Sequence, residues 1–260
     1  MCLIFVAWRK HPRYRLVVAA NRDEFYARAT APAGFWDEAP GVLAGRDLEA
    51  GGTWLGVSRG GRFAALTNYR GGDVAGAGAP SRGHLVSEYL RARHAPQAYL
   101  DSLAGRAGAY NGFNLLVADG DGLHWYSNRA AGPRALAPGI YGISNSLLDT
   151  PWPKLVRGKT AFAELVDDAH VDVEAMFDLL ADRQPSDDAD LPDTGIGLER
   201  ERALSSLFIS TPDYGTRSST VLLIEDTGDA TLHERTHEPG TTASQTLTYT
   251  YPVEPDREAV

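Results

Sequence analysis

Cys2 is the residue of this sequence whose type and place allow covalent chemistry. Initiator methionine is usually removed when the next residue is small, and removal would leave a thiol and a free α-amine on Cys2. The reference pKa is about 7.7–8.0 for the amine and about 8.5 for the thiol, so the amine can accept the thiol proton. One residue would then supply nucleophile and base. From position alone, a small buried hydrophobic residue at the start of a strand explains Cys2 better. If Met1 is retained, the nitrogen of Cys2 is an amide and cannot act as a base.

The polar string Asn21–Glu24 is expected to lie beside Cys2. Residues Cys2–Trp8 and Arg15–Ala20 are short and apolar and predict two strands of a hairpin. An antiparallel hairpin brings the start of its first strand beside the end of its second. There, a cation would lower the pKa of the thiol, a carboxylate could anchor the ammonium, and an amide could hold a substrate carbonyl. The alternative interpretation is a charged hairpin end in water, where an Arg–Asp pair contributes little.

The remaining pattern predicts blocks of strands separated by helix pairs. Residues Tyr26–Pro40 are expected to form a polar loop that contains proline. The order does not alternate strictly, as a parallel doubly wound sheet would. It favours an α+β class fold in which two antiparallel sheets pack face to face with helices outside, a four-layer αββα sandwich. The expected strands are 53–57, 62–67, 113–117, 123–126, 140–143, 219–224 and 231–235, and the expected helices are 81–93, 96–103, 153–166 and 172–180.

Composition excludes several classes of protein. The net charge of −9 argues against a nucleic-acid partner, because phosphate binding needs a basic surface. The single cysteine rules out an intrachain disulfide, and no apolar run approaches the roughly 20 residues that span a bilayer. We therefore expect a cytoplasmic protein without a transmembrane segment. The seven histidines lack the spacing of a zinc helix, so we expect no metal and no cofactor. We expect one domain over 1–240, then an edge strand or partly disordered tail over 241–260, and the sequence leaves the oligomeric state open.

Five blocks of sequence, in order along nearly the whole chain, resemble the NRDE family, which is named after transport and Golgi organisation protein 2. No single block is decisive, but the ordered set is highly specific. The blocks are LVVAANRDEF (Leu16–Phe25), LAGRDLEAGGTWLGVSRGGRFAALTNYR (Leu43–Arg70), FNLLVAD (Phe113–Asp119), YGISNSLLDTPWPK (Tyr141–Lys154) and YGTRSSTVLLI (Tyr214–Ile224).

The resemblance implies an N-terminal nucleophile hydrolase-like fold with distant similarity to penicillin V acylases and conjugated bile acid hydrolases. Those relatives use an N-terminal cysteine, an Arg and an Asp after the second strand, an asparagine pair for the oxyanion, and a distal Arg. Their Arg and Asp are separated, whereas here they are adjacent, and neighbouring side chains of a strand point to opposite faces. By position, the implied catalytic residues are Cys2 as nucleophile, Arg22 and Asp23 to steady the thiolate and the amine, Asn68 and Asn145 as oxyanion donors, and Arg217 as the distal cation. We also predict that the substrate contacts Asn21, Glu24, Trp54 and Tyr69.

Two functions from different classes remain open on the sequence. The first is a cysteine amidohydrolase that acts on a non-peptide C–N bond of a small or acyl-bearing substrate. The second is a non-enzymatic carrier or chaperone of haem or of an acyl lipid, which the family's association with Golgi organisation, haem trafficking and lipid metabolism implies. Either ligand would occupy a cleft between the two sheets.

Overall fold

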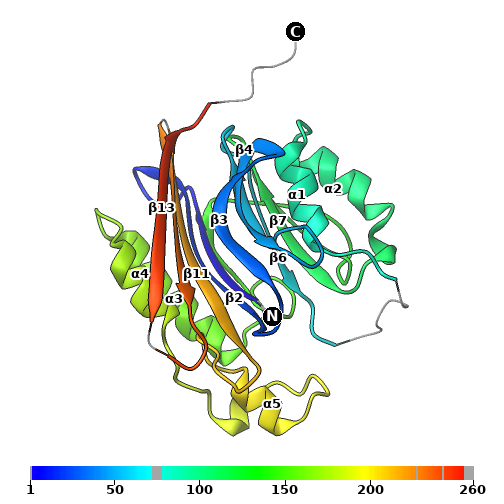
Figure 1. The fold of residues 1–260 in the computed structure, drawn as a ribbon, viewed down its shortest axis with the longest axis vertical. Helices are drawn as coiled ribbons and strands as arrows, with labels where there is room; N and C mark the ends of the chain where they lie inside the picture. The colour runs from blue at the N-terminus through cyan, green and yellow to red at the C-terminus, as the bar shows by residue number, and fades with distance from the viewer. Residues whose placement is uncertain (1, 72–77, 227, 242, 255–260) are drawn as a thin grey trace.

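Two antiparallel sheets pack face to face, and helices cover both outer faces (Figure 1). The computed structural model describes residues 2–71, 78–226, 228–241 and 243–254. The predicted four-layer αββα sandwich is confirmed. No helix within these described ranges is both long and apolar enough to cross a membrane.

The first sheet has six strands and carries the N-terminal strand near one edge. Its order is β10-β1-β2-β11-β12-β13, and every pairing is antiparallel. Strand β1 therefore has a neighbour on each side. The strands are β1 (Cys2–Trp8), β2 (Tyr14–Phe25), β10 (Gly139–Ile143), β11 (Tyr214–Glu225), β12 (Asp229–His237) and β13 (Ser244–Pro252).

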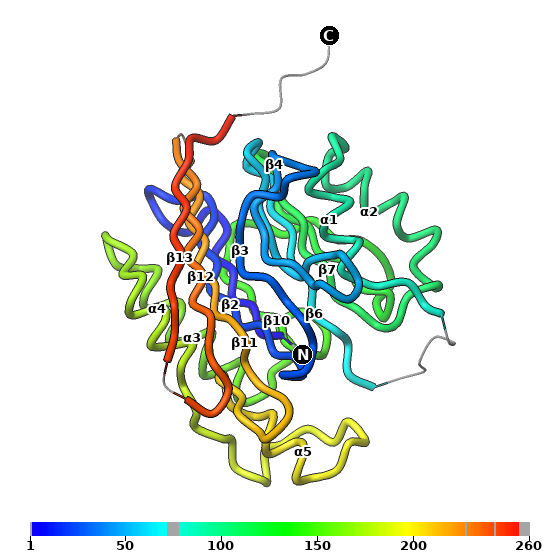
Figure 2. Tube along the Cα trace, in the orientation of Figure 1, coloured from blue at the N-terminus to red at the C-terminus, as the bar shows by residue number. Residues whose placement is uncertain are grey.

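The second sheet has seven strands that follow the chain in order from β3 to β9. Strand β1 contacts β6 of this sheet, and β12 contacts β3, so the two sheets approach each other near the start of β1 (Figure 2). The strands are β3 (Thr30–Trp36), β4 (Ala39–Asp47), β5 (Leu55–Ser58), β6 (Phe63–Asn68), β7 (Phe113–Ala118), β8 (Leu123–Ser127) and β9 (Arg134–Leu136).

Four helices form the outer layers. The pair α1 (Gly83–Arg91) and α2 (Pro96–Ala104) packs on the seven-stranded sheet, where α1 contacts β5 and β6. The pair α3 (Pro153–Asp167) and α4 (Val173–Leu180) packs on the six-stranded sheet. The short elements are α5 (Leu198–Ala203) and the 3-10 turns η1 (Ala107–Ala109) and η2 (Asp188–Asp190).

The alternation of side chains along β1 and β2 decides which residues face the other sheet. In β1, Ile4 and Val6 belong to the core between the sheets, whereas Leu3 and Phe5 pack under α3 and α4. From Leu16 to Ala20 of β2, even-numbered residues likewise face the other sheet, and odd-numbered residues face the helices. Because side chains alternate with a period of two, Cys2 continues the inter-sheet face of β1.

Two predictions for residues 21–40 differ from the structure. The polar string Asn21–Glu24 is not a hairpin end, because β2 continues to Phe25 and pairs there with β11. The predicted loop Tyr26–Pro40 contains strand β3, which the sequence pattern did not predict because Pro32 within it argues against a strand. Strand β3 is at the edge of its sheet, where proline is tolerated because no ladder hydrogen bond is lost.

The C-terminal residues add a strand to the six-stranded sheet. Strand β13 pairs with β12 along its whole length, from Asp229 opposite Pro252 to His237 opposite Ser244. It is the outermost strand of that sheet. Of the predicted tail, residues 242 and 255–260 lie outside the described residues.

Candidate functional site

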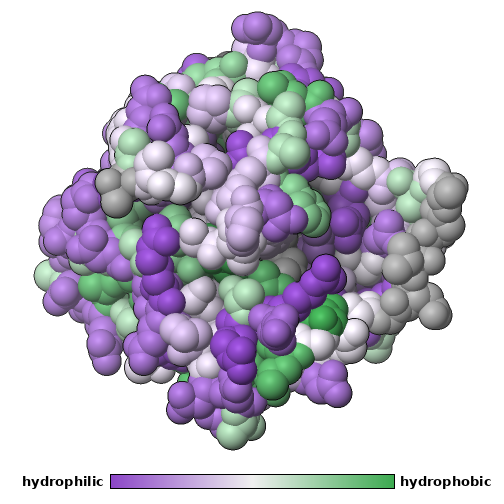
Figure 3. Space-filling view, turned by 60° about the horizontal axis from the view of Figure 1, so that its bottom comes forward, coloured by the Kyte–Doolittle hydropathy of each residue, from purple (hydrophilic) through white to green (hydrophobic). Residues whose placement is uncertain are grey.

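A cavity of about 850 Å³ opens between the two sheets at the start of β1. Its volume falls within the range of small-molecule sites in proteins. The face of the molecule in Figure 3 is largely hydrophilic, with smaller apolar areas between the charged side chains. Seven of the ten predicted site residues line the cavity, and they come from four strands and one loop. Those lining residues are Cys2, Arg22, Asp23, Glu24, Trp54, Asn68 and Arg217.

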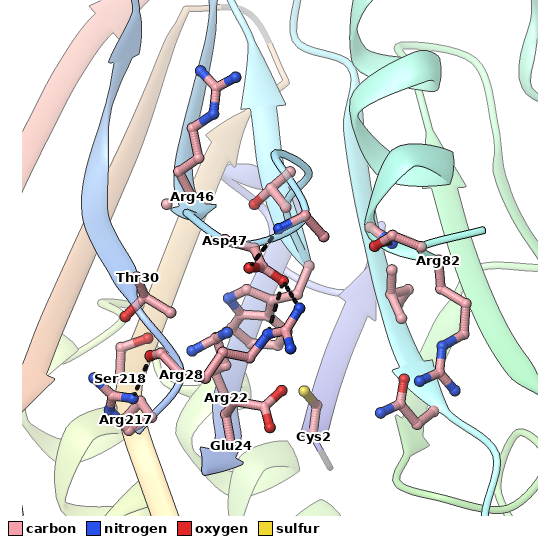
Figure 4. Close-up of a pocket in the computed structure, with 18 of the residues that line it drawn as sticks. Cys2, Arg22, Glu24, Arg28, Thr30, Arg46, Asp47, Arg82, Arg217 and Ser218 are labelled. Carbon is pink, nitrogen blue, oxygen red and sulfur yellow. Dashed lines mark hydrogen bonds and ion pairs between the residues drawn. The ribbon is translucent and has the colours of Figure 1, made fainter. Parts of the chain in front are cut away.

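Cys2 lies in the wall of this cavity with 8% of its surface exposed. Its cross-strand partner is Arg22, so both side chains emerge on the inter-sheet face. In Figure 4, Arg22 and Glu24 stand on one side of the thiol and Arg82 on the other. Burial raises the pKa of the Cys2 thiol, and the Asp23 carboxylate adds to the rise, whereas the Asp23 backbone N–H and Arg22 oppose it. The thiol is therefore a poor thiolate source without a base.

Asp23 lies behind Cys2, on the helix-facing side of β2. Its Oδ1 accepts a hydrogen bond of 2.7 Å from the Thr216 hydroxyl, and its backbone carbonyl accepts one of 2.9 Å from the Tyr214 hydroxyl. Burial raises the pKa of Asp23 to about 6, although Lys154, Thr216 and Arg22 act to lower it. Adjacent Arg22 and Asp23 thus do point to opposite faces, and they approach Cys2 from two sides.

The raised pKa of Asp23 predicts a measurable dependence of stability on pH. Its pKa of about 6 in the folded chain exceeds the unfolded value of about 3.9, so the folded state binds the extra proton between these values. This contribution is fully present below about pH 4 and is lost as pH rises through about 6. Between pH 4 and 7, the free energy of unfolding of the wild-type protein should therefore fall by about 2 kcal/mol on account of Asp23. We expect this fall to be absent in Asp23→Asn when urea unfolding is measured over the same pH range. Exposed Asp121→Asn is the control, and an unchanged slope in Asp23→Asn would contradict the assignment.

Lys154 is a buried cation that the sequence did not predict as a site residue. Its Nζ donates a hydrogen bond of 2.8 Å to the carbonyl of Leu204. Burial lowers the pKa of Lys154 to about 8, and the Asp23 carboxylate opposes that shift. The residue ends the sequence block Tyr141–Lys154, and its place after Pro153 in the first turn of α3 was the only signal for it.

The two predicted oxyanion donors occupy different positions. Asn68, at the end of β6, lines the cavity from the seven-stranded sheet. Asn145 is fully buried and does not line it. The side-chain amide of Asn145 donates a hydrogen bond of 2.9 Å to the backbone carbonyl of Asn68, and the backbone carbonyl of Asn145 accepts one of 2.7 Å from the Arg70 N–H. In this geometry Asn145 holds the end of β6 in place.

Arg217 reaches the cavity because β11 is irregular at this residue. The register of β11 against β2 shifts between Thr216 and Ser218, which is a β-bulge. Bulges redirect side chains next to functional sites. The Arg217 guanidinium donates to the backbone carbonyls of Phe25, Tyr26 and Arg28 at 3.0–3.2 Å. It therefore fixes the turn after β2 and does not reach Cys2 as a free cation.

Two predicted substrate contacts lie outside the cavity. Asn21 is fully buried on the helix-facing side of β2, where its amide donates to the carbonyls of Leu180 and Leu207 at 2.8 and 2.9 Å. Its carbonyl accepts from the Ser219 hydroxyl at 2.6 Å. Asn21 therefore anchors the helix layer to β2. Tyr69 follows β6, and its backbone N–H bonds the carbonyl of Gly112.

The cavity is also lined by cations that the sequence did not predict. Arg28 is ion-paired with Asp47 at 2.7 Å and with Glu49 at 3.0 Å. Arg46 is ion-paired with Glu38. Arg82 directly precedes α1 and is far from Cys2 in sequence. Packing of the two sheets brings Arg82 and Cys2 to the same cavity. Among the described residues, no group of three or more His, Cys, Asp and Glu side chains is arranged to hold a metal ion.

Comparisons with known proteins place this arrangement in a family. The family model described as Transport and Golgi organisation 2 matches residues 1–239. The Transport and Golgi organization protein 2 homolog of Bos taurus is 42% identical over 90% of this chain and 92% of its own length. The Drosophila melanogaster protein of that name is 31% identical over 86% of this chain and 88% of its own length.

Solved structures show the same fold at low sequence identity. A penicillin V acylase from Agrobacterium tumefaciens has a TM-score of 0.50 and 11% identity, over 95% of this chain and 85% of that one. A variant of the conjugated bile acid hydrolase from Clostridium perfringens has a TM-score of 0.51 and 9% identity, over 98% of both chains. Two antiparallel sheets with outer helices are thus common to this chain and to N-terminal nucleophile hydrolases. The chain belongs to the Transport and Golgi organisation 2 family.

Proposed function

We propose that this protein is a cysteine amidohydrolase of the N-terminal nucleophile type, which cleaves a non-peptide C–N bond of a small substrate. The observation that carries the proposal is the place of Cys2. Its side chain opens into the cavity of about 850 Å³ between the sheets, opposite Arg22 in the ladder and across from Asn68 of the other sheet. A structural cysteine at the start of a strand needs neither the cavity nor these partners.

The proposed chemistry begins after removal of Met1. The free α-amine of Cys2 takes the thiol proton, and the thiolate attacks the carbonyl carbon of the amide to form a C–S bond. The oxyanion of the tetrahedral intermediate accepts a hydrogen bond from the side-chain amide of Asn68. The protonated amine then gives its proton to the leaving nitrogen, and the C–N bond breaks. Water, deprotonated by the same amine, hydrolyses the thioester to a carboxylic acid and regenerates Cys2.

The electrostatics of the site support a base that is close to the thiol. Burial raises the pKa of Cys2, so most of the thiol is protonated near neutrality. Asp23 lies behind Cys2 and can pair with an ammonium group formed there, because a carboxylate favours a nearby positive charge. Arg22 is on the cavity side, where it favours the thiolate. Proton transfer from the thiol to the α-amine gives a thiolate and an ammonium group. The positive charge of Arg22 favours the thiolate, and the negative charge of Asp23 favours the ammonium group.

The carrier of haem or acyl lipid is the second candidate, and the character of the cavity favours it less. Binding sites for apolar ligands are lined mostly by hydrophobic and aromatic side chains. Here five arginines, Arg22, Arg28, Arg46, Arg82 and Arg217, line the wall together with four carboxylate residues. Such a wall suits a polar substrate that is turned over in the cavity.

The test of the proposal controls the N-terminus and leaves the folded chain unchanged. A chain carrying an N-terminal extension with a protease site directly before Cys2 is compared with the same chain after release, and intact mass verifies each end. A panel of small N-acyl amides is then assayed for release of amine. We expect turnover only after release, because only then is the α-amine free. Equal turnover before and after release would rule out the proposed base. No turnover in either form, with tight binding of haem or an acyl lipid, would favour the carrier.

A further inference from the structure

Five arginines line the cavity, and their pairing separates them into two groups. Arg28 and Arg46 are neutralised by carboxylates, and Arg217 donates to three backbone carbonyls. The side chain of Arg22 makes neither a hydrogen bond nor an ion pair with the described residues, whereas its backbone belongs to the sheet. Arg82 donates one hydrogen bond, at 3.0 Å to the carbonyl of Gly112, and has no ion pair among those residues.

These two guanidinium groups lie on opposite sides of the Cys2 thiol. Arg22 is the cross-strand partner of Cys2 within the six-stranded sheet. Arg82 approaches from the segment that leads into α1, on the other side of the thiol (Figure 4). Each guanidinium carries five N–H donors in a planar fork that fits a carboxylate or a phosphate. Both residues line the cavity, and most of their donors have no acceptor among the described residues.

The carboxylates that line the cavity accept hydrogen bonds from other groups of the protein, and none forms an ion pair with the Arg22 or Arg82 guanidinium among the described residues. Glu24 accepts a hydrogen bond from the backbone N–H of Phe25 at 2.9 Å. Glu234 accepts one from Ala33 N–H at 2.6 Å, and burial raises its pKa, although Arg22 opposes that shift. Burial also lowers the pKa of Arg82, with Cys2 and Glu24 acting in the other direction. A partly desolvated cation without an ion pair is costly unless a ligand completes it.

We propose that Arg82 and Arg22 bind an anionic group, a carboxylate or a phosphate, on the molecule that occupies the cavity beside Cys2. This inference rests on the proposed function in taking that molecule to be the amide substrate. It assigns to Arg82 a role in selecting anionic substrates. The protein as a whole carries a net charge of −9, so an anion is attracted here only by the local field of the cavity.

The charge of the site can be measured without any turnover. Iodoacetate and iodoacetamide alkylate the same thiol and differ mainly in charge, and Cys2 is the only cysteine of the chain. The ratio of the two alkylation rates is measured by intact mass on the folded chain and on the chain unfolded in urea. We expect folding to raise the iodoacetate-to-iodoacetamide ratio at least about five-fold, because two unpaired cations flank the thiol. A ratio unchanged by folding, or a thiol that neither reagent reaches, would overturn the inference.

Matched variants assign the effect to the two arginines. Arg82→Met and Arg22→Met should each lower the folded ratio by about three-fold or more. Arg46→Met is the control, because that guanidinium lines the same cavity but is paired with Glu38, and its ratio should stay at the wild-type value. Arg82→Lys keeps the charge and should keep the ratio, which separates charge from folding if Arg82→Met is unstable. Equal ratios in Arg82→Met and wild type would remove Arg82 from the site.

Protection of Cys2 then identifies the anionic group. Iodoacetamide labelling is repeated with N-acetylglycine, with inorganic phosphate, and with neutral N-acetylglycinamide. Protection by N-acetylglycine alone points to a carboxylate, and protection by phosphate points to a phosphate-bearing ligand. Equal protection by N-acetylglycinamide, or none by either anion, counts against an anion site whatever the outcome of the turnover assays. Turnover limited to neutral amides would leave the proposed function in place and reject only this inference.

Discussion

Replacement of Cys2 by alanine is expected to abolish turnover and to leave the fold intact. Loss of a catalytic nucleophile typically lowers the rate by several orders of magnitude, and we expect a fall of at least about 10⁴-fold in kcat/KM. The structural cost is small, because the side chain loses one sulfur atom at the wall of an open cavity. We expect the free energy of unfolding to fall by about 1 kcal/mol. Amide hydrolysis and urea unfolding of the same preparations check both numbers.

The matched control for this variant is Cys2→Ser. Serine keeps a nucleophile and the same shape, but its hydroxyl is less acidic than a thiol, so it should retain a small residual rate above Cys2→Ala. Cys2→Ala within ten-fold of wild-type turnover would show that the reaction does not use the thiol. A Cys2→Ala chain that unfolds, with no activity found for wild type, would support the interpretation of Cys2 as a structural residue.

The part of the site that the sequence predicted follows from the register of one hairpin. The short turn after Trp8 pairs Trp8 with Leu16, and counting along both strands then sets Cys2 opposite Arg22. The period of two also separates the faces, with Arg22 toward the cavity and Asp23 toward the helices. The local sequence pattern was sufficient to place Cys2 beside Arg22, because the register set at the turn fixes every residue pair along the seven residues of β1. This register does not depend on the rest of the chain.

The part that the sequence did not predict depends on packing between distant segments. Arg82 is 80 residues from Cys2, and only the approach of the two sheets brings it to the thiol. Asn21 and Arg22 are neighbours in one polar string, yet Asn21 is committed to the helix layer. Arg217 likewise donates to backbone carbonyls, and the direction of its side chain depends on a β-bulge that the residue types do not predict. Residue type alone does not tell a ligand contact from a buried anchor.

The buried ion pair Arg70–Glu201 is expected to govern the stability of the region around Asn68. The two side chains are 7% and 4% exposed and lie 2.6 Å apart. Glu201 also accepts a hydrogen bond of 2.9 Å from the backbone N–H of Thr194, so the pair ties the segment before α5 to the residues after β6. Arg70 is two residues beyond Asn68, and its backbone N–H bonds Asn145. Loss of the pair should therefore loosen the proposed oxyanion donor as well.

Glu201→Gln keeps the shape of the side chain and removes its charge, so the buried Arg70 guanidinium loses the carboxylate of its ion pair. Removing one partner of a buried pair typically costs about 3–5 kcal/mol, and we expect a loss of about 3 kcal/mol in urea unfolding. The double variant Arg70→Met/Glu201→Gln removes both charges and should recover most of that loss, since a buried pair itself contributes little net stability. A double variant as unstable as the sum of the two single variants would show that the charges act independently. In that case the end of β6 would be held by the Asn145 hydrogen bonds and not by this ion pair.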